Sequence, residues 1–226
     1  MAESGTQALL FDIDGTLIST GGASDRAWKR AFKELQGVDV DIPAVTGKGV
    51  PDPEVGRVVF ERALGREPTE EEADALMRRR LDHLPEEVEN SPGYLVQDCV
   101  VETLERVSAD GILLGLTTGN VEEAARIKLE RADLDRFFSF GGYGSDSPDR
   151  TELTRKALER AGERYGEGFD LSRCFSCGDT PRDVEAGHGA GIRVVGVATG
   201  EFTAEELKEA GAEAAIRSFC EGLPLL

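Results

Sequence analysis

The sequence predicts an α/β fold, a doubly wound parallel sheet, because short apolar runs alternate with helical patterns along most of the chain. Mostly apolar runs lie at 8–11, 111–116, 174–177 and 192–197, and a shorter one lies at 137–140. Four or five consecutive apolar residues are typical of a strand that is buried on both faces, as in a parallel sheet. We therefore predict five strands in one sheet.

Helical patterns separate these runs, at 121–132, 151–165 and 181–190. Parallel strands need a long crossover connection, which is usually a helix. The order strand, helix, strand thus supports a Rossmann-like arrangement.

The stretch from about residue 19 to residue 90 contains no convincing strand. Residues 23–36 have the apolar spacing of an amphipathic helix, and 53–64 and 69–84 predict two more. Thr69 with the three acids that follow it is a typical helix start. We expect a helical insertion here.

The chain length agrees with that division. At 226 residues it is about one and a half times as long as a typical domain. We predict a core formed by 1–18 and 91–226, with the helical domain at 19–90. The arginines at 78–80 are expected to be the solvated last turn of the third helix.

The charge balance limits the classes of partner. Lys and Arg number 26 against 44 Asp and Glu, a formal net charge of −18. Non-specific binding to nucleic acid or to an anionic membrane needs a basic face, so neither partner is expected. An anionic substrate would have to be held by a few placed cations or by a metal.

The cysteines and the N-terminus favour a cytoplasmic protein. Four cysteines, Cys99, Cys174, Cys177 and Cys220, are too few for a disulfide scaffold. Cys174 and Cys177 have the C-x-x-C spacing of redox and zinc sites, but an odd separation in a strand places them on opposite faces. The first residues have no basic start followed by an apolar stretch, so no secretory signal is expected.

Carboxylates follow two of the predicted strands. Asp12 and Asp14 come directly after 8–11, and Asp179 and Asp183 come after 174–177. The chemistry of open parallel sheets lies at the carboxyl ends of the strands. Two carboxylate pairs at neighbouring strand ends repel each other unless a divalent cation lies between them, and oxygen ligands without His or Cys suit Mg²⁺.

A third strand end carries Thr118, Gly119 and Asn120 just before a helix. A hydroxyl and free backbone N–H groups at a helix N-terminus form an anion site. Taken alone, the same residues also fit an ordinary helix cap.

Together these motifs resemble the haloacid dehalogenase superfamily of phosphatases. The resemblance rests on Asp-Ile-Asp-Gly-Thr at 12–16, a Thr at the second strand end and Gly-Asp-x-x-x-Asp at 178–183, in the family's order and spacing. The helical insertion resembles the family's C1 cap, and the branch is that of phosphoglycolate phosphatases and β-phosphoglucomutases.

This resemblance implies roles for individual residues. Asp12 would be the nucleophile that forms an aspartyl-phosphate, and Asp14 would be the general acid and then the base. Mg²⁺ would be bound by Asp12, the backbone carbonyl of Asp14, Asp179 and Asp183. Phosphate oxygens would be held by Thr118 and Gly119, with Asn120 close by.

The family's usual Lys-Pro after the third motif is absent, which leaves two candidates for the phosphate-binding cation. Arg150 stands nearest to that place and can bind phosphate in bidentate fashion, and Lys156 lies deeper in the helix. We favour Arg150. In the glycine-rich loop at 45–52, Lys48 is a candidate contact for the distal group of the substrate.

The resemblance therefore implies a Mg²⁺-dependent phosphatase of a small phosphorylated metabolite, such as phosphoglycolate or a sugar phosphate. The chain would act as a monomer or weak homodimer. One alternative is a phosphoglucomutase-like phosphotransferase, and another is a non-catalytic binding module that has kept the fold.

Overall fold

The computed structural model describes residues 6–47 and 49–224. Its main sheet has six parallel strands in the order β5-β4-β1-β6-β7-β8. Their bounds are β1 (Ala8–Phe11), β4 (Leu113–Thr118), β5 (Gly141–Tyr143), β6 (Cys174–Gly178), β7 (Arg193–Val197) and β8 (Ala214–Ile216). The predicted fold class is confirmed. β1 lies at the centre of the sheet, so Asp12 follows a strand that is paired on both sides.

The predicted strand at 137–140 is wrong. The segment begins at the last residue of the 3-10 helix η1 (Asp135–Phe137), and the strand follows the segment as β5. Phe138 and Phe140 are buried in the two main apolar clusters, which explains the apolar run. In β5, a Cβ on Gly142 would lie 1.7 Å from the carbonyl oxygen of Leu153. The strand needs glycine for this close approach, and glycine weakens the strand signal of its sequence.

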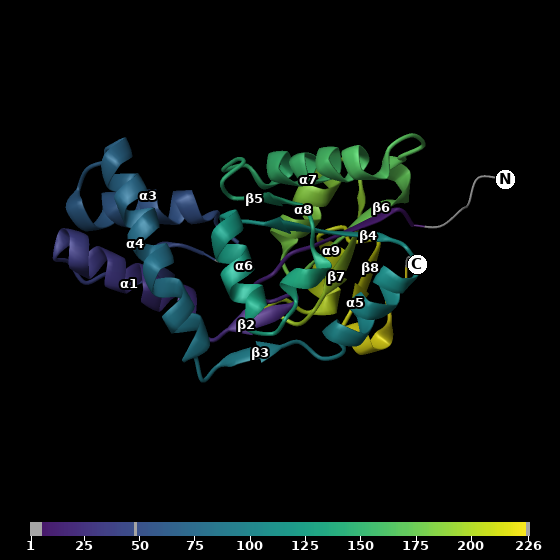
Figure 1. Ribbon diagram of the computed structural model, residues 1–226, viewed down its shortest axis with the longest axis horizontal. Coiled ribbons are helices and arrows are strands. Elements are labelled where there is room, and N and C mark those ends of the chain that lie inside the picture. The colour runs from purple at the N-terminus through teal and green to yellow at the C-terminus, as the bar shows by residue number, and fades with distance from the viewer. Residues whose placement is uncertain (1–5, 48, 225–226) are drawn as a thin grey trace.

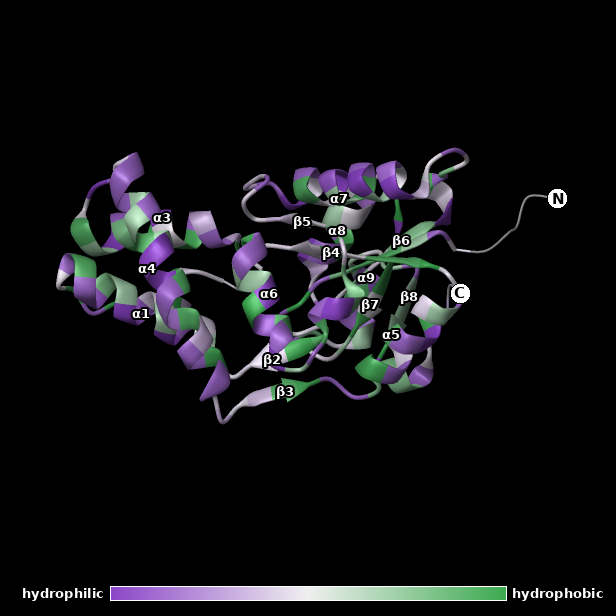
Figure 2. Cartoon of the chain, in the orientation of Figure 1, coloured by the Kyte–Doolittle hydropathy of each residue, from purple (hydrophilic) through white to green (hydrophobic). Residues whose placement is uncertain are grey.

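Helices cover both faces of the sheet (Figure 1). They are α5 (Val100–Ala109), α6 (Glu122–Glu130), α7 (Arg150–Tyr165), α8 (Pro181–Gly189) and α9 (Ala204–Glu209), with η2 (Leu171–Arg173) before β6. Leu9 and Phe11 pack into one apolar cluster, and Ala8 and Leu10 pack into another on the opposite face. The central strands are accordingly the most hydrophobic part of the molecule (Figure 2).

Cys174 and Cys177 behave as the strand period predicts. Both are free and buried, and they belong to the clusters on opposite faces of the sheet. Burial raises the pKa of Cys177 to about 12, which leaves its thiol protonated and unreactive. The pair is therefore structural.

The other two cysteines form a disulfide, Cys99–Cys220. It joins the residue that precedes α5 to the 3-10 helix η3 (Phe219–Glu221) near the C-terminus. The partners are 121 residues apart, so their spacing gave no signal of the pairing. The small number of cysteines excluded a disulfide scaffold, but it did not exclude a single disulfide.

The insertion contains α1 (Ala23–Gln36), α2 (Ile42–Val45), α3 (Asp52–Leu64) and α4 (Glu70–Glu89), as predicted except for the short α2. It is joined to the core through an antiparallel ribbon of β2 (Ile18–Thr20) and β3 (Tyr94–Val96). Figure 1 shows its helices beyond one end of the sheet. Their own apolar cluster is formed by Trp28, Phe32, Phe60 and neighbours.

The arginines at 78–80 do not end their helix, which continues through Pro85 to Glu89. Arg80 is fully buried, whereas the side chain of the neighbouring Arg79 is exposed. The expectation of a solvated last turn is therefore wrong, because the run spans both an outward and an inward position of α4.

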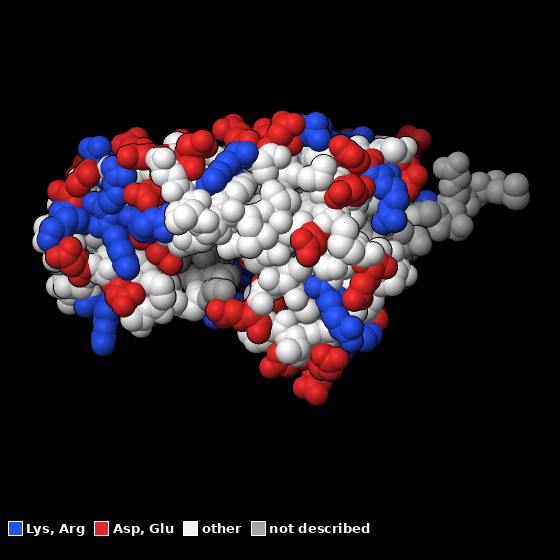
Figure 3. All heavy atoms as spheres, turned by 90° about the horizontal axis from the view of Figure 1, so that it is seen from below, with Lys and Arg blue, Asp and Glu red and all other residues white. Residues whose placement is uncertain are grey.

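Basic side chains at the surface are matched by acids. Figure 3 shows Lys and Arg gathered over the insertion with Asp and Glu beside them. Arg57 pairs with Glu54, Glu61 and Glu67, and Arg66 pairs with Glu72. Among the described residues, no helix is both long and apolar enough to cross a bilayer.

Candidate active site

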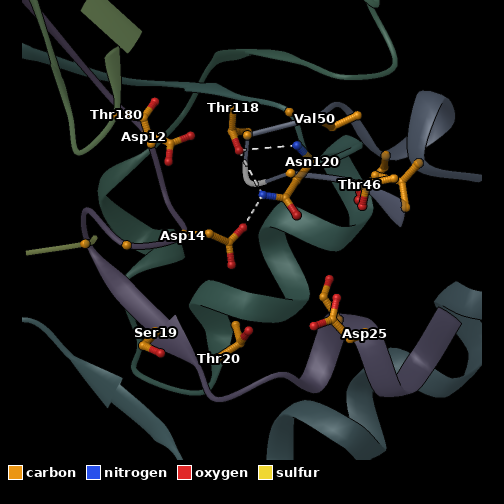
Figure 4. Close-up of a pocket in the computed structure, with 18 of the residues that line it drawn as sticks. Asp12, Asp14, Ser19, Thr20, Asp25, Thr46, Val50, Thr118, Asn120 and Thr180 are labelled. Carbon is orange, nitrogen blue, oxygen red and sulfur yellow. Dashed lines mark hydrogen bonds between the residues drawn. The ribbon is translucent and has the colours of Figure 1, made fainter. Parts of the chain in front are cut away.

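A cleft of about 440 Å³ lies between the carboxyl ends of the central strands and the helical insertion. This volume is in the range of pockets that hold small molecules. Side chains from the core line one part of it: Asp12, Asp14, Thr118, Asn120, Lys128, Arg150, Thr180 and Asp183. Side chains from the insertion line the rest, among them Ser24, Asp25, Trp28, Thr46, Val50 and Asp52. Figure 4 shows Asp12, Asp14 and Asn120 around the same space as Asp25 and Thr46.

Three buried carboxylates meet at the ends of β1 and β6. Oxygens of Asp12, Asp179 and Asp183 lie within 4.8 Å of one another. Thr16 donates a hydrogen bond to Asp179 at 3.0 Å. Asp183 also caps α8, because its Oδ2 accepts from the backbone N–H and the hydroxyl of Thr180. Its Oδ1 accepts a hydrogen bond from Arg150.

Glycines make room for this cluster. Gly15 has φ +93°, and a Cβ there would lie 2.3 Å from Asp179 Oδ2. A Cβ on Gly200 would lie 1.8 Å from the same oxygen, and one on Gly178 would lie 2.3 Å from Asp183 Cβ. Any larger residue would displace the carboxylates, so the loops are shaped around them.

The electrostatics of the cluster favour a cation. Burial, followed by repulsion from Asp183, raises the pKa of Asp12 well above its usual value, although Arg150 acts against the rise. Burial and Asp183 likewise raise the pKa of Asp179 to about 7. A divalent metal would remove this repulsion, and three carboxylates with no nitrogen or sulfur donor fit a hard ion such as Mg²⁺. The residues present therefore fit a metal.

Arg150, the first residue of α7, reaches into the cluster. Its Nη2 lies 3.3 Å from Asp12 Oδ1 and also donates to Asp183 Oδ1. Its Nη1 donates to the carbonyl of Gly49 in the insertion at 3.1 Å. Its Nε is buried and has no hydrogen-bond partner within the described part of the chain. Lys156, by contrast, is 41% exposed and pairs with Glu159.

A second network surrounds Asp14. Asn120 Nδ2 donates to Asp14 Oδ2 and to Thr118 Oγ1, both at 2.8 Å (Figure 4). Lys128 Nζ donates to the same Asp14 oxygen at 2.6 Å and to Asn120 Oδ1 at 2.5 Å. Burial acts to raise the pKa of Asp14, but the charge of Lys128 and the hydrogen bonds from Asn120 and Lys128 outweigh it, so the pKa is lowered.

The insertion closes over the cleft at Asp52. Its backbone N–H donates to the carbonyl of Gly119 at 2.8 Å, and its Oδ2 accepts from the N–H of Val121 at 3.0 Å. A Cβ on Gly119 would lie 3.1 Å from Pro51 Cα, so the two segments are in close contact. Lys48, expected in this loop as a substrate contact, lies outside the described residues.

Comparison with known proteins identifies the family. The model of the haloacid dehalogenase-like hydrolase family matches residues 6–191. The chain belongs to the haloacid dehalogenase-like hydrolase family. The resemblance of the strand-end motifs to that superfamily is thus confirmed, and the chain is classed as a hydrolase.

Relatives of this haloacid dehalogenase-like hydrolase match over nearly the whole chain. A phosphoglycolate phosphatase of Mesorhizobium japonicum is 30% identical, over 93% of this chain and 90% of its own length. A phosphoglycolate phosphatase of Agrobacterium fabrum is 29% identical, over 96% and 91%. The crystal structure of a predicted phosphoglycolate phosphatase from Haemophilus somnus 129PT has the same fold, with a TM-score of 0.73, 20% identity and 96% of both chains covered.

The structure of this haloacid dehalogenase-like hydrolase brings together every predicted site residue that it describes. It also adds Lys128, which the sequence analysis missed. Lys128 occupies an inward position of α6, with Ala124, Ala125 and Leu129 as the other buried residues of that helix. A lysine in the apolar register of a helix is the signal that could have found it.

Proposed function

We propose that this hydrolase is a Mg²⁺-dependent phosphatase. It cleaves a small phosphate monoester, of the phosphoglycolate or sugar-phosphate type, through an intermediate phosphorylated on Asp12. The observation that carries the proposal is that Asp12 and Asp14 line one cleft together with Arg150, while Asp179 and Asp183 lie beside Asp12. Two relatives that carry the name phosphoglycolate phosphatase support this class of substrate.

Asp12 would attack the phosphorus of the ester and form an aspartyl-phosphate. A carboxylate nucleophile divides one difficult displacement into two easier steps. Thr118, the backbone N–H of Gly119 and Arg150 would hold the phosphoryl oxygens, with Asn120 close by. The buried Nε of Arg150, which has no partner among the described residues, is a donor suited to that role.

Asp12, Asp179, Asp183 and the backbone carbonyl of Asp14 would hold the Mg²⁺ ion. When bound, Mg²⁺ offsets the repulsion between the attacking carboxylate and the phosphate. Thr16 and the three glycines that surround Asp179 and Asp183 keep these acids in place.

Asp14 would move the protons. Because the pKa of Asp14 is lowered in the substrate-free protein, its carboxylate would first have to take up a proton as substrate binds. As the bond between phosphorus and the ester oxygen breaks, the ester oxygen would take that proton from the Asp14 carboxyl group. The resulting carboxylate then takes a proton from the water that attacks the aspartyl-phosphate, which frees Asp12 and releases inorganic phosphate.

The helical insertion at 19–90 would act as a C1 cap that excludes water during phosphoryl transfer and opens for turnover. Thr46 and Val50 of its loop line the cleft, which supports this role. Lys48 of the same loop would contact the distal group of the substrate. The enzyme would act on a metabolite in the cytoplasm, as a monomer or weak homodimer.

The test is phosphate release from an aryl phosphate and from a panel of phosphorylated metabolites, with and without Mg²⁺. We expect Mg²⁺-dependent release by the parent protein and its loss in Asp12→Asn. A parent inactive on every ester would refute a phosphatase, and activity that survives Asp12→Asn would refute the covalent intermediate. A sugar bisphosphate among the products would indicate phosphotransfer instead.

A further inference from the structure

Lys128 is the most deeply buried cation in the cleft that no motif of the family pattern accounts for. Lys128 is 2% exposed, and it comes from α6 and not from a strand end. Burying an ammonium group is unfavourable unless it is paired and hydrogen-bonded. A use for its charge is therefore expected at the place where its nitrogen lies.

The nitrogen of Lys128 lies between the two groups that would serve the proton-transfer step. It donates to Asp14 Oδ2 at 2.6 Å and to Asn120 Oδ1 at 2.5 Å. Asn120 in turn donates to Asp14 Oδ2 at 2.8 Å, which closes a triangle of three hydrogen bonds. The bond from Lys128 fixes the amide orientation of Asn120, because only the amide oxygen can accept it.

Both hydrogen bonds to Asp14 in this triangle are made to Oδ2, so Oδ1 takes no part in the triangle. The Asp14 side chain is 41% exposed, whereas that of Lys128 is 3% exposed. Seen from the cleft, the lysine therefore lies behind the carboxylate, whose exposed side faces the cleft. Asp25 of α1 is another acid whose charge interacts with Lys128, and it lines the cleft from the insertion. Asp14 is the only carboxylate hydrogen-bonded to the amine among the described residues.

We propose that Lys128 is a positioning residue that, with Asn120, holds the Asp14 carboxyl group with Oδ1 directed at the leaving-group oxygen. The inference rests on the proposed function, since it assigns Asp14 its proton-transfer role. The lysine exchanges no proton and forms no bond with the substrate. It acts by keeping Asp14 in one rotamer. A long, flexible side chain can do this only if it is itself held in place by packing, and Lys128 is buried.

The test uses the dependence of kcat/KM on the leaving group. Loss of a correctly placed acid lowers the rate most where the departing oxygen needs a proton, as in an alkyl phosphate, and least for p-nitrophenyl phosphate. We expect Lys128→Met to lower kcat/KM about 100-fold on an alkyl phosphate and less than about 5-fold on p-nitrophenyl phosphate. Lys33→Met, at an exposed pair with Asp39, is the control and should leave both values unchanged.

A double-mutant cycle tests whether the lysine acts through Asp14. Combined with Asp14→Ala, Lys128→Met should lower kcat/KM on the alkyl phosphate no further than Asp14→Ala does alone. Equal losses on both leaving groups, or an undiminished effect in the Asp14→Ala background, would overturn the proposal. If Lys128→Met does not fold, Lys128→Gln is measured in the same way, since it keeps a donor without the charge. A parent with no phosphatase activity would instead refute the proposed function.

Discussion

The carboxylate of Asp52 accepts hydrogen bonds from both terminal nitrogens of Arg80, from Nη1 to Oδ2 at 2.8 Å and from Nη2 to Oδ1 at 3.0 Å. The same Oδ2 accepts from the backbone N–H of Val121 at the start of α6. One ion pair of the insertion is therefore bonded directly to the loop that carries Thr118, Gly119 and Asn120. It joins the predicted cap to the phosphate-binding end of the sheet.

Arg80→Met should destabilise the protein strongly, because it leaves the Asp52 carboxylate buried with a single backbone donor. Removing one partner of a buried ion pair costs about 3–5 kcal/mol. Urea unfolding measures the change. Arg79→Met, at the exposed neighbouring position, is the matched control and should change stability by less than about 0.5 kcal/mol. Equal effects of the two substitutions would contradict the assignment.

The stability gained from Mg²⁺ should depend on pH through Asp179. Burial and Asp183 raise the pKa of this residue to about 7 in the folded chain, against about 4 in an unfolded chain. The stability that its proton contributes to the metal-free protein is present below about pH 4 and is lost as the pH rises through about 7.

Mg²⁺ competes with that proton, so its apparent affinity should rise roughly tenfold per pH unit up to about pH 7. We therefore expect a larger increase of Tm on addition of Mg²⁺ at pH 8 than at pH 5.5, measured by calorimetry. Asp179→Asn should abolish most of the increase at both pH values. A Tm increase in the parent that does not vary with pH would argue against this account.

Arg150→Ala should lower kcat/KM far more than Lys156→Ala, because Arg150 lies against Asp12 while Lys156 pairs with Glu159 on the exposed side of α7. Loss of one placed donor to the transition state lowers the rate about 100- to 1,000-fold. Steady-state kinetics on the best ester of the panel measures both variants. The reverse ranking would transfer the phosphate-binding role to Lys156.

The Cys99–Cys220 disulfide should contribute to stability, since it closes a loop of 121 residues in the unfolded chain. We expect Cys220→Ser to lower the free energy of unfolding by about 2–4 kcal/mol. Thiol titration of the denatured protein without reductant should detect only Cys174 and Cys177. Four titratable thiols would show that the bond is not formed. As a control, reductant should not lower the free energy of unfolding of Cys220→Ser any further.

The sequence predicted those parts of the fold that are encoded by local pattern. The apolar runs of β1, β4, β6 and β7 and the amphipathic period of α1 are local features, and their positions were predicted to within two residues. β5 was misplaced because close packing against α7 requires glycine there. β8 (Ala214–Ile216) is too short to form a clear apolar run.

The candidate site was predictable where function places acids directly after strands. Asp12, Asp14, Asp179 and Asp183 stand out because a carboxylate at the end of a buried run is unfavourable without a use. Lys128 and Arg80 did not stand out, since their partners lie 114 and 28 residues away in the chain. The local pattern of α6 could have marked Lys128 as a buried position, but the partner of such a salt bridge is a property of the tertiary fold, which no local spacing reports.

The strand order has a consequence for the way the chain folds. β1 is made first, but its neighbours in the sheet begin at Leu113 and Cys174. The central strand must therefore wait for most of the chain to be synthesised, while α1 and α4 can already pack against each other. Contacts so distant in sequence slow folding. In the nascent chain, the apolar segment Ala8–Phe11 would stay unpaired for longer than any other strand. This segment is therefore the strand most available for aggregation and for chaperone binding.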